Sequence, residues 1–364
     1  MISFGMTEEQ ELVRDAMQEF ASEVFRPVAR ECDENSEIPD DLLQSVWELG
    51  LTSTQIPADY GGGGEPRSPV TNTIVLEEMA HGDAALTVAA LAPSLFANAI
   101  ADYGDADQKQ RYLPEFCGES FYTGSLAVVE PGPLVEPLRP RTLAEPKGEG
   151  WVLSGAKSCV VLGDRAHQFL VFARNQDRVE AFIVAREADG LSISERELNM
   201  GLKGVPTVRL DLERVSVGPE DRLGGTSGCD VARILNGARV GQAAVLLGLS
   251  RAVLEYCVPY AKDRVAFDEA IAKKQSIAFR LAEMHIHCEA LRNLVWQAAC
   301  FLEKGGDVTR AARHARTYAN EHAMWVADNG IQVLGGHGFI REHPVELWFR
   351  HARTLSVLEG AVAV

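Results

Sequence analysis

The carboxylate best placed for acid–base chemistry in this sequence is Glu359, in the segment RTLSVLEGAVAV at residues 353–364. Most of its neighbours are apolar. A carboxylate among apolar neighbours holds a proton more readily than one in water, as a general base working near neutral pH requires. The alternative is a solvated side chain, as most glutamates near a chain end are. Glu359 is therefore a candidate base for proton abstraction, with the solvated alternative open.

A metal site is not predicted. His285, His287 and Cys288 lie close together in the sequence, within a stretch of helical period. On a helix, however, only His285 and Cys288 share a face, because residues two apart point in nearly opposite directions. Two ligands do not complete a zinc site, so we expect a partly buried helix face here and no metal.

Two glycine clusters have the composition of a turn or a ligand-binding loop. Gly61–Gly64 is not followed by the Gly-Lys-Ser/Thr of a phosphate loop, so a turn is the better prediction. Gly335–Gly338, in GGHG, follows a predicted helix. It either ends that helix or lets the backbone approach a ligand closely, and both interpretations stay open.

The composition limits the classes of protein to consider. Lysine and arginine number 35 against 52 aspartates and glutamates, a net charge of −17, so general binding to nucleic acid or to an anionic membrane is not expected. We expect no apolar run approaching the roughly 18 residues of a membrane span, and no secretory signal. The seven scattered cysteines fit reduced thiols, so a cytoplasmic location is predicted.

The elements that must position these residues change period twice along the chain. Residues 1–120 have helical spacing, residues 121–225 contain short β-branched runs between turns, and residues 226–364 are helical again. The predicted fold is therefore α+β. It has an N-terminal helical domain, a middle β domain and a C-terminal helical domain.

Helix boundaries follow from a few residues. Thr7 with Gln10 makes a plausible capping box for the first helix, and Pro27 is expected to mark its end. The long helical stretch after residue 228 contains Pro259, which is expected to bend it.

Several motifs together resemble the acyl-CoA dehydrogenases over nearly the whole chain. They are PADYGGGG, VVEPG, GWVLSGAKSCVVLG, LNMGLKGVPT, DRVAF, KKQSIAFRLAEM and, above all, QVLGGHGFIREHPVELWFRHAR followed by LEG. The resemblance implies a β-barrel-like middle domain, a C-terminal four-helix bundle, and FAD lying between them. It also implies a dimer or a dimer of dimers.

The resemblance further implies α,β-desaturation of an acyl-CoA thioester to the trans-2-enoyl-CoA, as in β-oxidation of fatty acids or steroid side chains. In this family a glutamate removes the α-proton, the β-hydrogen leaves as hydride to the flavin, and an electron-transfer flavoprotein usually reoxidises the FAD. Glu359 falls on the position of that glutamate. Asn236 and Arg239 fall on a substrate-holding Asp…Arg pair, with the aspartate replaced.

One group of FAD contacts, those within the subunit that carries the flavin, is altered. Val128 and Val129 stand at the strand contact, where a threonine is usual in place of Val129. Three other family motifs are also replaced in this sequence. Leu134-Val135 stands where the family has Gly-Ser, Cys159-Val160-Val161 where it has Trp-Ile-Thr, and Ala361-Val362 where it has Thr-Ser. Each exchange removes a hydroxyl or an aromatic plane. A ligand group left without its hydrogen bond costs about 1–3 kcal/mol.

The second group, which reaches the FAD of a neighbouring subunit, is kept. Its residues are Arg264, Phe267, Gln275, Gln332, Gly335 and Gly336. We infer a partner subunit of a hetero-oligomeric acyl-CoA dehydrogenase, of the kind known in bacteria that degrade steroid side chains, in which only some pockets hold FAD. The sequence stops four residues after Gly360, which we interpret as a flavin pocket that needs no covering tail. Two alternatives stay open: a homo-oligomer with an atypical flavin pocket, and a non-catalytic member kept for assembly or thioester binding.

Overall fold

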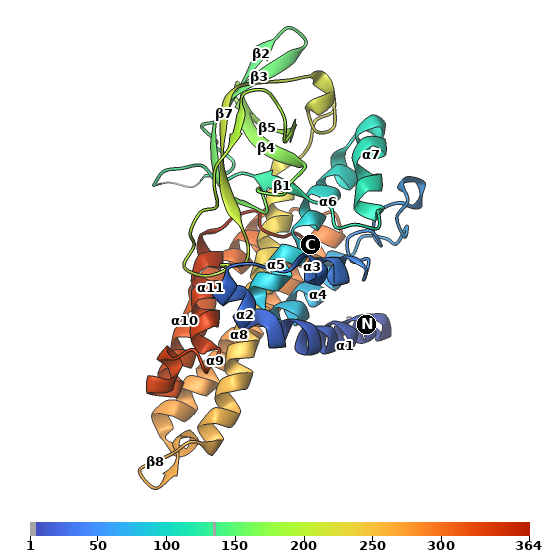
Figure 1. Cartoon of the computed structure of the whole chain (residues 1–364). Coiled ribbons are helices and arrows are strands. Elements are labelled where there is room, and N and C mark those ends of the chain that lie inside the picture. Colours follow the sequence, from blue (N-terminus) through green and yellow to red (C-terminus); the bar gives the residue numbers. More distant parts are fainter. Residues whose placement is uncertain (1–4, 134–135) are drawn as a thin grey trace.

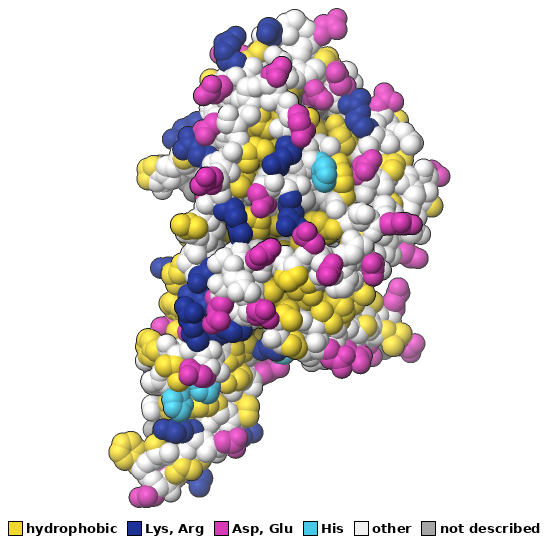
Figure 2. Space-filling model, viewed as in Figure 1, with side chains coloured by type: hydrophobic (Ala, Val, Ile, Leu, Met, Phe, Trp, Pro, Cys, Tyr) yellow, Lys and Arg dark blue, Asp and Glu magenta, His cyan; other side chains and the backbone are white. Residues whose placement is uncertain are grey.

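The chain folds into helices, a β-sheet and helices again, in the order predicted (Figure 1). The computed structural model describes residues 5–133 and 136–364. The sheet lies at one end of the molecule, with the N-terminal helices beside it, and the longest helix runs from beneath the sheet to the opposite tip. On the face drawn in Figure 2, acidic side chains are scattered among basic ones.

The N-terminal part is built from short helices. They are α1 (Glu8–Phe20), α2 (Arg26–Asn35), α3 (Asp40–Trp47), α4 (Pro69–Gly82), α5 (Ala84–Leu91), α6 (Pro93–Tyr103) and α7 (Ala106–Tyr112). The capping box predicted at Thr7 and Gln10 is confirmed: the Thr7 hydroxyl accepts from the Gln10 N–H at 3.2 Å. Pro27 does not end the helical path. A π-helical turn at residues 21–25 leads into α2, and Pro27 lies in the first turn of that helix, where no amide donor is needed.

The middle part is a seven-stranded sheet. Its strands are β1 (Gly124–Ala127), β2 (Leu143–Lys147), β3 (Gly150–Val161), β4 (Gln168–Asn175), β5 (Arg178–Ala185), β6 (Leu191–Ile193) and β7 (Thr207–Val217). The strand order is β1-β4-β2-β3-β7-β6, and β5 pairs with β4. The pairing of β3 with β7 slips between Lys157 and Val160. Within this irregular stretch Cys159 takes a positive φ of 55°, an uncommon conformation for a residue with a side chain.

The C-terminal part is a bundle of four helices: α8 (Val231–Asp263), α9 (Gln275–Glu303), α10 (Thr309–Leu334) and α11 (Val345–Val357). Pro259 lies inside α8 without ending it. A small hairpin of β8 (Val265–Ala266) and β9 (Glu269–Ala270) joins α8 to α9 at the far tip of the molecule (Figure 1).

Two stretches are longer and more apolar than the sequence analysis expected. Ala84–Tyr103, which spans α5 and α6, and the helix α8 both reach the length and hydropathy of a membrane span. The expectation that no such run exists was therefore wrong. The most apolar windows are 83% and 61% buried inside the protein, so their apolar side chains form the core on which the other helices pack.

Candidate functional site

Glu359 follows the end of α11 and faces α8. Its carboxylate lies 3.3 Å from Nε of Arg239 and 3.4 Å from the Nη2 atom of the same guanidinium. The Glu359 side chain is 16% exposed. The sequence left two alternatives open for this carboxylate, a solvated one and one among apolar neighbours. The structure shows neither, because an arginine from another helix contacts the carboxylate.

Asn236 lies one helical turn before Arg239 on α8 and is buried. Its amide nitrogen is 3.4 Å from the hydroxyl of Thr309, a weak contact. Its side-chain oxygen is buried and has no hydrogen-bond partner within the described residues. Buried acceptors are nearly always paired, so this oxygen marks a place where a ligand or water would donate a hydrogen bond. Three predicted site residues, Glu359, Arg239 and Asn236, are therefore brought together.

The backbone after Glu359 passes close to β1. A Cβ atom at Gly360 would lie 2.9 Å from a methyl group of Leu126 and 3.3 Å from one of Val128, and Gly360 has a φ of 75°. Only glycine combines this conformation with so close an approach. The residues that follow, Ala361 and Val362, are buried. The chain after Glu359 therefore packs against hydrocarbon side chains.

Val128 and Val129, the predicted flavin contacts of this subunit's own pocket, are buried. The carbonyl of Val129 accepts from the Ser158 N–H at 3.0 Å, and its side chain offers no donor. Cys159 directs its backbone N–H to the carboxylate of Glu197 at 3.0 Å. Burial, together with that carboxylate, raises the pKa of the Cys159 thiol to about 11, so it stays protonated at neutral pH. Leu134-Val135 lies outside the described residues.

Glu130, next to Val129, ties the segment that follows β1 to the sheet. Its carboxylate accepts from Lys157 Nζ at 2.9 Å and from the hydroxyl of Thr142 at 2.6 Å. Lys157 is fully buried, so Glu130 neutralises a cation that has no access to water. This ion pair supports the backbone of the predicted flavin strand.

The second predicted FAD group lies at the opposite tip of the molecule. Its members come from the end of α8, the β8–β9 hairpin, the start of α9 and the end of α10: Arg264, Phe267, Gln275, Gln332, Gly335 and Gly336. All of them are exposed, and Phe267 is 88% exposed. Within residues 5–133 and 136–364, the side chains of Arg264, Gln275 and Gln332 make no hydrogen bond.

This exposed group has side chains that could contact a dinucleotide. A free guanidinium suits a pyrophosphate, and two free amides suit polar ring edges. Gly335 has a φ of 60°, and no atom lies within 4 Å of a Cβ built on Gly335 or Gly336, so a ligand could approach the backbone there. The buried side chains of Val128 and Val129, by contrast, carry no hydrogen-bond donor for the polar edge of a flavin.

The Arg264 group lies far from the Glu359–Arg239 pair within one chain. Arg239 and Arg264 are 25 positions apart (264 − 239) along α8 and its end. At 1.5 Å per residue this is roughly 37 Å. The structure thus brings Asn236, Arg239 and Glu359 to one place and the Arg264 group to another.

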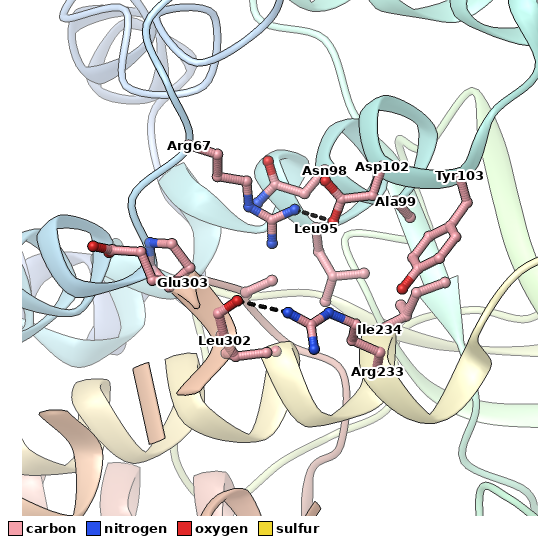
Figure 3. A pocket seen from close by; sticks show the side chains of 13 residues that line it. Arg67, Leu95, Asn98, Ala99, Asp102, Tyr103, Arg233, Ile234, Leu302 and Glu303 are labelled. Carbon is pink, nitrogen blue, oxygen red and sulfur yellow. Dashed lines mark hydrogen bonds and ion pairs between the residues drawn. The ribbon is translucent and has the colours of Figure 1, made fainter. Parts of the chain in front are cut away.

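Sequence reasoning missed two cavities. The first, about 320 Å³, lies between α6, α8 and the segment before α4, and Figure 3 shows Arg67 and Arg233 reaching into it from opposite sides. The second, about 510 Å³, lies between α1, α4 and the α5–α6 stretch. Asn98 and Ala363 border both cavities. No sequence motif predicts these cavities, because their walls come from segments far apart in the chain.

Arg67 and Arg233 are held in place by the chain itself. Arg67 pairs with Asp102 and donates to the carbonyl of Val364, and Arg233 donates to the carbonyl of Leu302 at 2.6 Å (Figure 3). Burial and the nearby Asp230 raise the pKa of Tyr103, which lines the same cavity, to about 12. Its phenol is therefore a neutral donor at physiological pH.

Comparison with known proteins identifies three consecutive family models. Residues 7–120 match the acyl-CoA dehydrogenase N-terminal domain, residues 125–215 the middle domain, and residues 227–364 the C-terminal domain. An acyl-CoA dehydrogenase of Bacillus subtilis is 31% identical over 365 residues, which cover 98% of this chain and 95% of that protein.

Two solved structures extend the similarity. The butyryl-CoA dehydrogenase of Megasphaera elsdenii has a TM-score of 0.88 and 29% identity, with 100% of this chain and 96% of that chain covered. A chain from a study of an electron transferring flavoprotein of Acidaminococcus fermentans has a TM-score of 0.88 and 28% identity, with the same coverage.

Proposed function

Because this chain belongs to the acyl-CoA dehydrogenase family, we propose that it is a subunit of an enzyme in which FAD sites are completed across subunits. The family assigns it to the oxidoreductases that act on the CH–CH group of acyl-CoA thioesters. Its fold is that of the family, with helical, β and helical domains in this order. The finer proposal concerns which residues act and on whose cofactor.

The observation that carries the proposed chemistry is the Glu359–Arg239 pair with the unpaired oxygen of Asn236 beside it. Glu359 acts as the base that removes the α-proton of the thioester. Arg239 holds the carboxylate directed toward α8 until substrate arrives. FAD, when bound, accepts the β-hydrogen as hydride. Asn236 supplies an acceptor for a polar group of the substrate.

The acyl chain is assigned to the two cavities that meet at Asn98 and Ala363. The first cavity adjoins α8 at Arg233 and Gly237, one turn or less from Asn236 and Arg239. Their volumes, about 320 and 510 Å³, are within the range of small-molecule sites. We propose no particular chain length.

The heteromer proposal is supported by the contrast between the two FAD groups. The Arg264 group is exposed and its polar side chains make no hydrogen bond within the described residues, whereas Val128 and Val129 are buried and carry no polar side-chain atom. A subunit with these properties would complete the FAD site of a homologous partner and retain little FAD itself. A homo-oligomer with an atypical pocket is the second candidate, and the retained Glu359–Arg239 pair favours it.

The remaining partners are proposed from the family resemblance. An electron-transfer flavoprotein would reoxidise the FAD of the complex, and the location would be the cytoplasm. A non-catalytic role in assembly or thioester binding is less well supported, because Glu359 and Arg239 are kept in contact.

The test is purification of this chain alone and together with a homologous partner chain, with flavin measured per polypeptide. We expect little flavin on the lone chain, and less than one flavin per polypeptide in the complex. The complex should convert butanoyl-CoA to the enoyl-CoA with an artificial electron acceptor. Full flavin loading of the lone chain would refute the heteromer proposal and leave the homo-oligomer.

A further inference from the structure

The backbone just before Glu359 is held by two buried side chains from different helices. The amide of Gln242, on α8, donates to the carbonyls of Leu355 and Leu358, the latter at 3.0 Å. The guanidinium of Arg316, on α10, donates to the carbonyls of Leu355, Ser356 and Leu358. These carbonyls belong to the C-terminal end of α11, where the last helical acceptors lack partners within the helix.

Arg316 is unusual because it is a buried cation without a carboxylate in contact. It is 6% exposed, and its acceptors are neutral: the three carbonyls and the side chain of Asn320. None of the ion pairs found among residues 5–133 and 136–364 includes it. A buried charge is costly unless an opposite charge or several hydrogen bonds compensate for it.

The charges around Arg316 point to Glu359 as its electrostatic partner. Burial lowers the pKa of Arg316 to about 10, the charge of Glu359 opposes this shift, and Arg239 adds to it. Arg316 therefore remains a cation at physiological pH. The end of α11 adds a further favourable interaction, since a cation near a helix C-terminus is stabilised by the helix dipole.

We propose that Arg316 is a positioning residue for Glu359, because it fixes the backbone that carries the carboxylate. The contact with Leu358, the residue directly before Glu359, carries the positioning. The inference rests on the proposed role of Glu359 as the base. Arg239 contacts the carboxylate itself and Arg316 contacts the backbone directly before it, so the carboxylate is held from two helices.

The titratable groups on the neighbouring elements are accounted for. Arg239 faces Glu359 from α8, and Arg316 faces it from α10. On α11 itself, His351 is turned to Asp83 of the N-terminal domain at 3.5 Å and accepts from the N–H of Leu202. Arg353 on the same helix is exposed. A change in the pH profile caused by Arg316 would therefore report on the surroundings of Glu359.

The experiment measures proton abstraction separately from hydride transfer. Phenylacetyl-CoA has α-hydrogens but no β-hydrogen, so no hydride can leave it. Exchange of its α-protons in heavy water therefore measures proton abstraction by the base without hydride transfer. Exchange is followed by NMR across a pH series with the assembled, flavin-loaded protein. The variants are R316M, R316K and Q242L, with R222M as the matched control, because Arg222 pairs with Glu180 in the β domain away from the site.

We expect R316M to slow exchange by about 10- to 100-fold and to move the acidic limb of the profile to higher pH. R316K keeps the positive charge but lacks the several N–H donors of the planar guanidinium. Exchange should therefore slow by about 10-fold, with the pH dependence of the rate unchanged. Q242L loses a neutral contact to the same carbonyl and should slow exchange without moving the profile. R222M should leave both unchanged.

Wild-type rate and profile in R316M would overturn the inference, and so would a slowed R316M with an unmoved profile. If R316M does not fold, R316K decides, and a wild-type rate in that variant would overturn it. Failure of the proposed function is distinguishable, because the wild-type protein itself would then show no exchange.

Discussion

Nε of Arg239 lies 3.3 Å from the carboxylate of Glu359, although the two residues are 120 positions apart. The contact joins the middle of the bundle to the segment after its last helix. A carboxylate held this way is directed before substrate arrives, so little reorganisation is needed for proton abstraction.

Replacing Glu359 with glutamine should slow α-proton exchange and desaturation by roughly 100- to 10,000-fold, the usual contribution of a general base. The amide keeps the shape of the side chain but cannot accept the proton. Because Arg239 and the buried Arg316 lose their opposite charge, thermal unfolding should also move to lower temperature, and circular dichroism at the assay temperature serves as the control for folding. Unchanged desaturation by a heteromeric complex would place the working base on the other subunit.

Replacing Arg264 with methionine should reduce the flavin held by the assembled complex. A charge-assisted hydrogen bond contributes about 1.5–3 kcal/mol, so FAD should bind about 10- to 100-fold more weakly. Flavin fluorescence during titration measures this. Lys262, exposed two residues earlier, gives the matched control K262M. Equal weakening in both variants would mean that general charge, and not a specific contact, is responsible.

Restoring a hydroxyl with V129T separates the two oligomer proposals. Val129 is buried, so an unpaired threonine hydroxyl should destabilise the chain by about 1–3 kcal/mol. If the chain's own pocket stays without flavin, this loss appears in urea unfolding whether or not FAD is added. Recovery of stability by FAD, with more flavin per polypeptide, would instead support a homo-oligomer that binds flavin beside Val129.

The Glu130–Lys157 pair predicts how stability responds to acid. Burial alone would raise the pKa of Glu130, but Lys157 and the Thr142 hydrogen bonds outweigh it and hold the pKa at about 2, below the ordinary 4.5. Stability from this pair is thus fully present above pH 4.5 and is lost as the pH falls from 4.5 through about 2.

The variant E130Q tests this response by urea unfolding over a pH series. It should be about 3–5 kcal/mol less stable near neutral pH, because Lys157 is left buried without its partner. Its stability should also fall less steeply in acid than that of the wild-type chain. E145Q, at an exposed position of β2, is the control. Parallel acid curves for E130Q and the wild type would contradict the assignment.

The sequence was most informative where structure depends on neighbours in the chain. Period changes predict the helix–sheet–helix order, and Thr7 with Gln10 predicts the first helix start. Pro27 misled because its effect depends on a π-helical turn just before it. Arg316 and Gln242 could not be found, since their acceptors are carbonyls more than 35 and 110 positions away, and a carbonyl leaves no mark in a sequence.

The length of α8 has a consequence for the behaviour of the protein in solution. Arg264 lies beyond the end of this helix, roughly 37 Å from Arg239, and under the proposed function it would contact the FAD of a neighbouring subunit. Cofactor retention then becomes a property of the assembly. Dilution that separates the subunits should release flavin. Adding more of this chain should restore the bound flavin, and the recovery should saturate at a fixed molar ratio of the two chains.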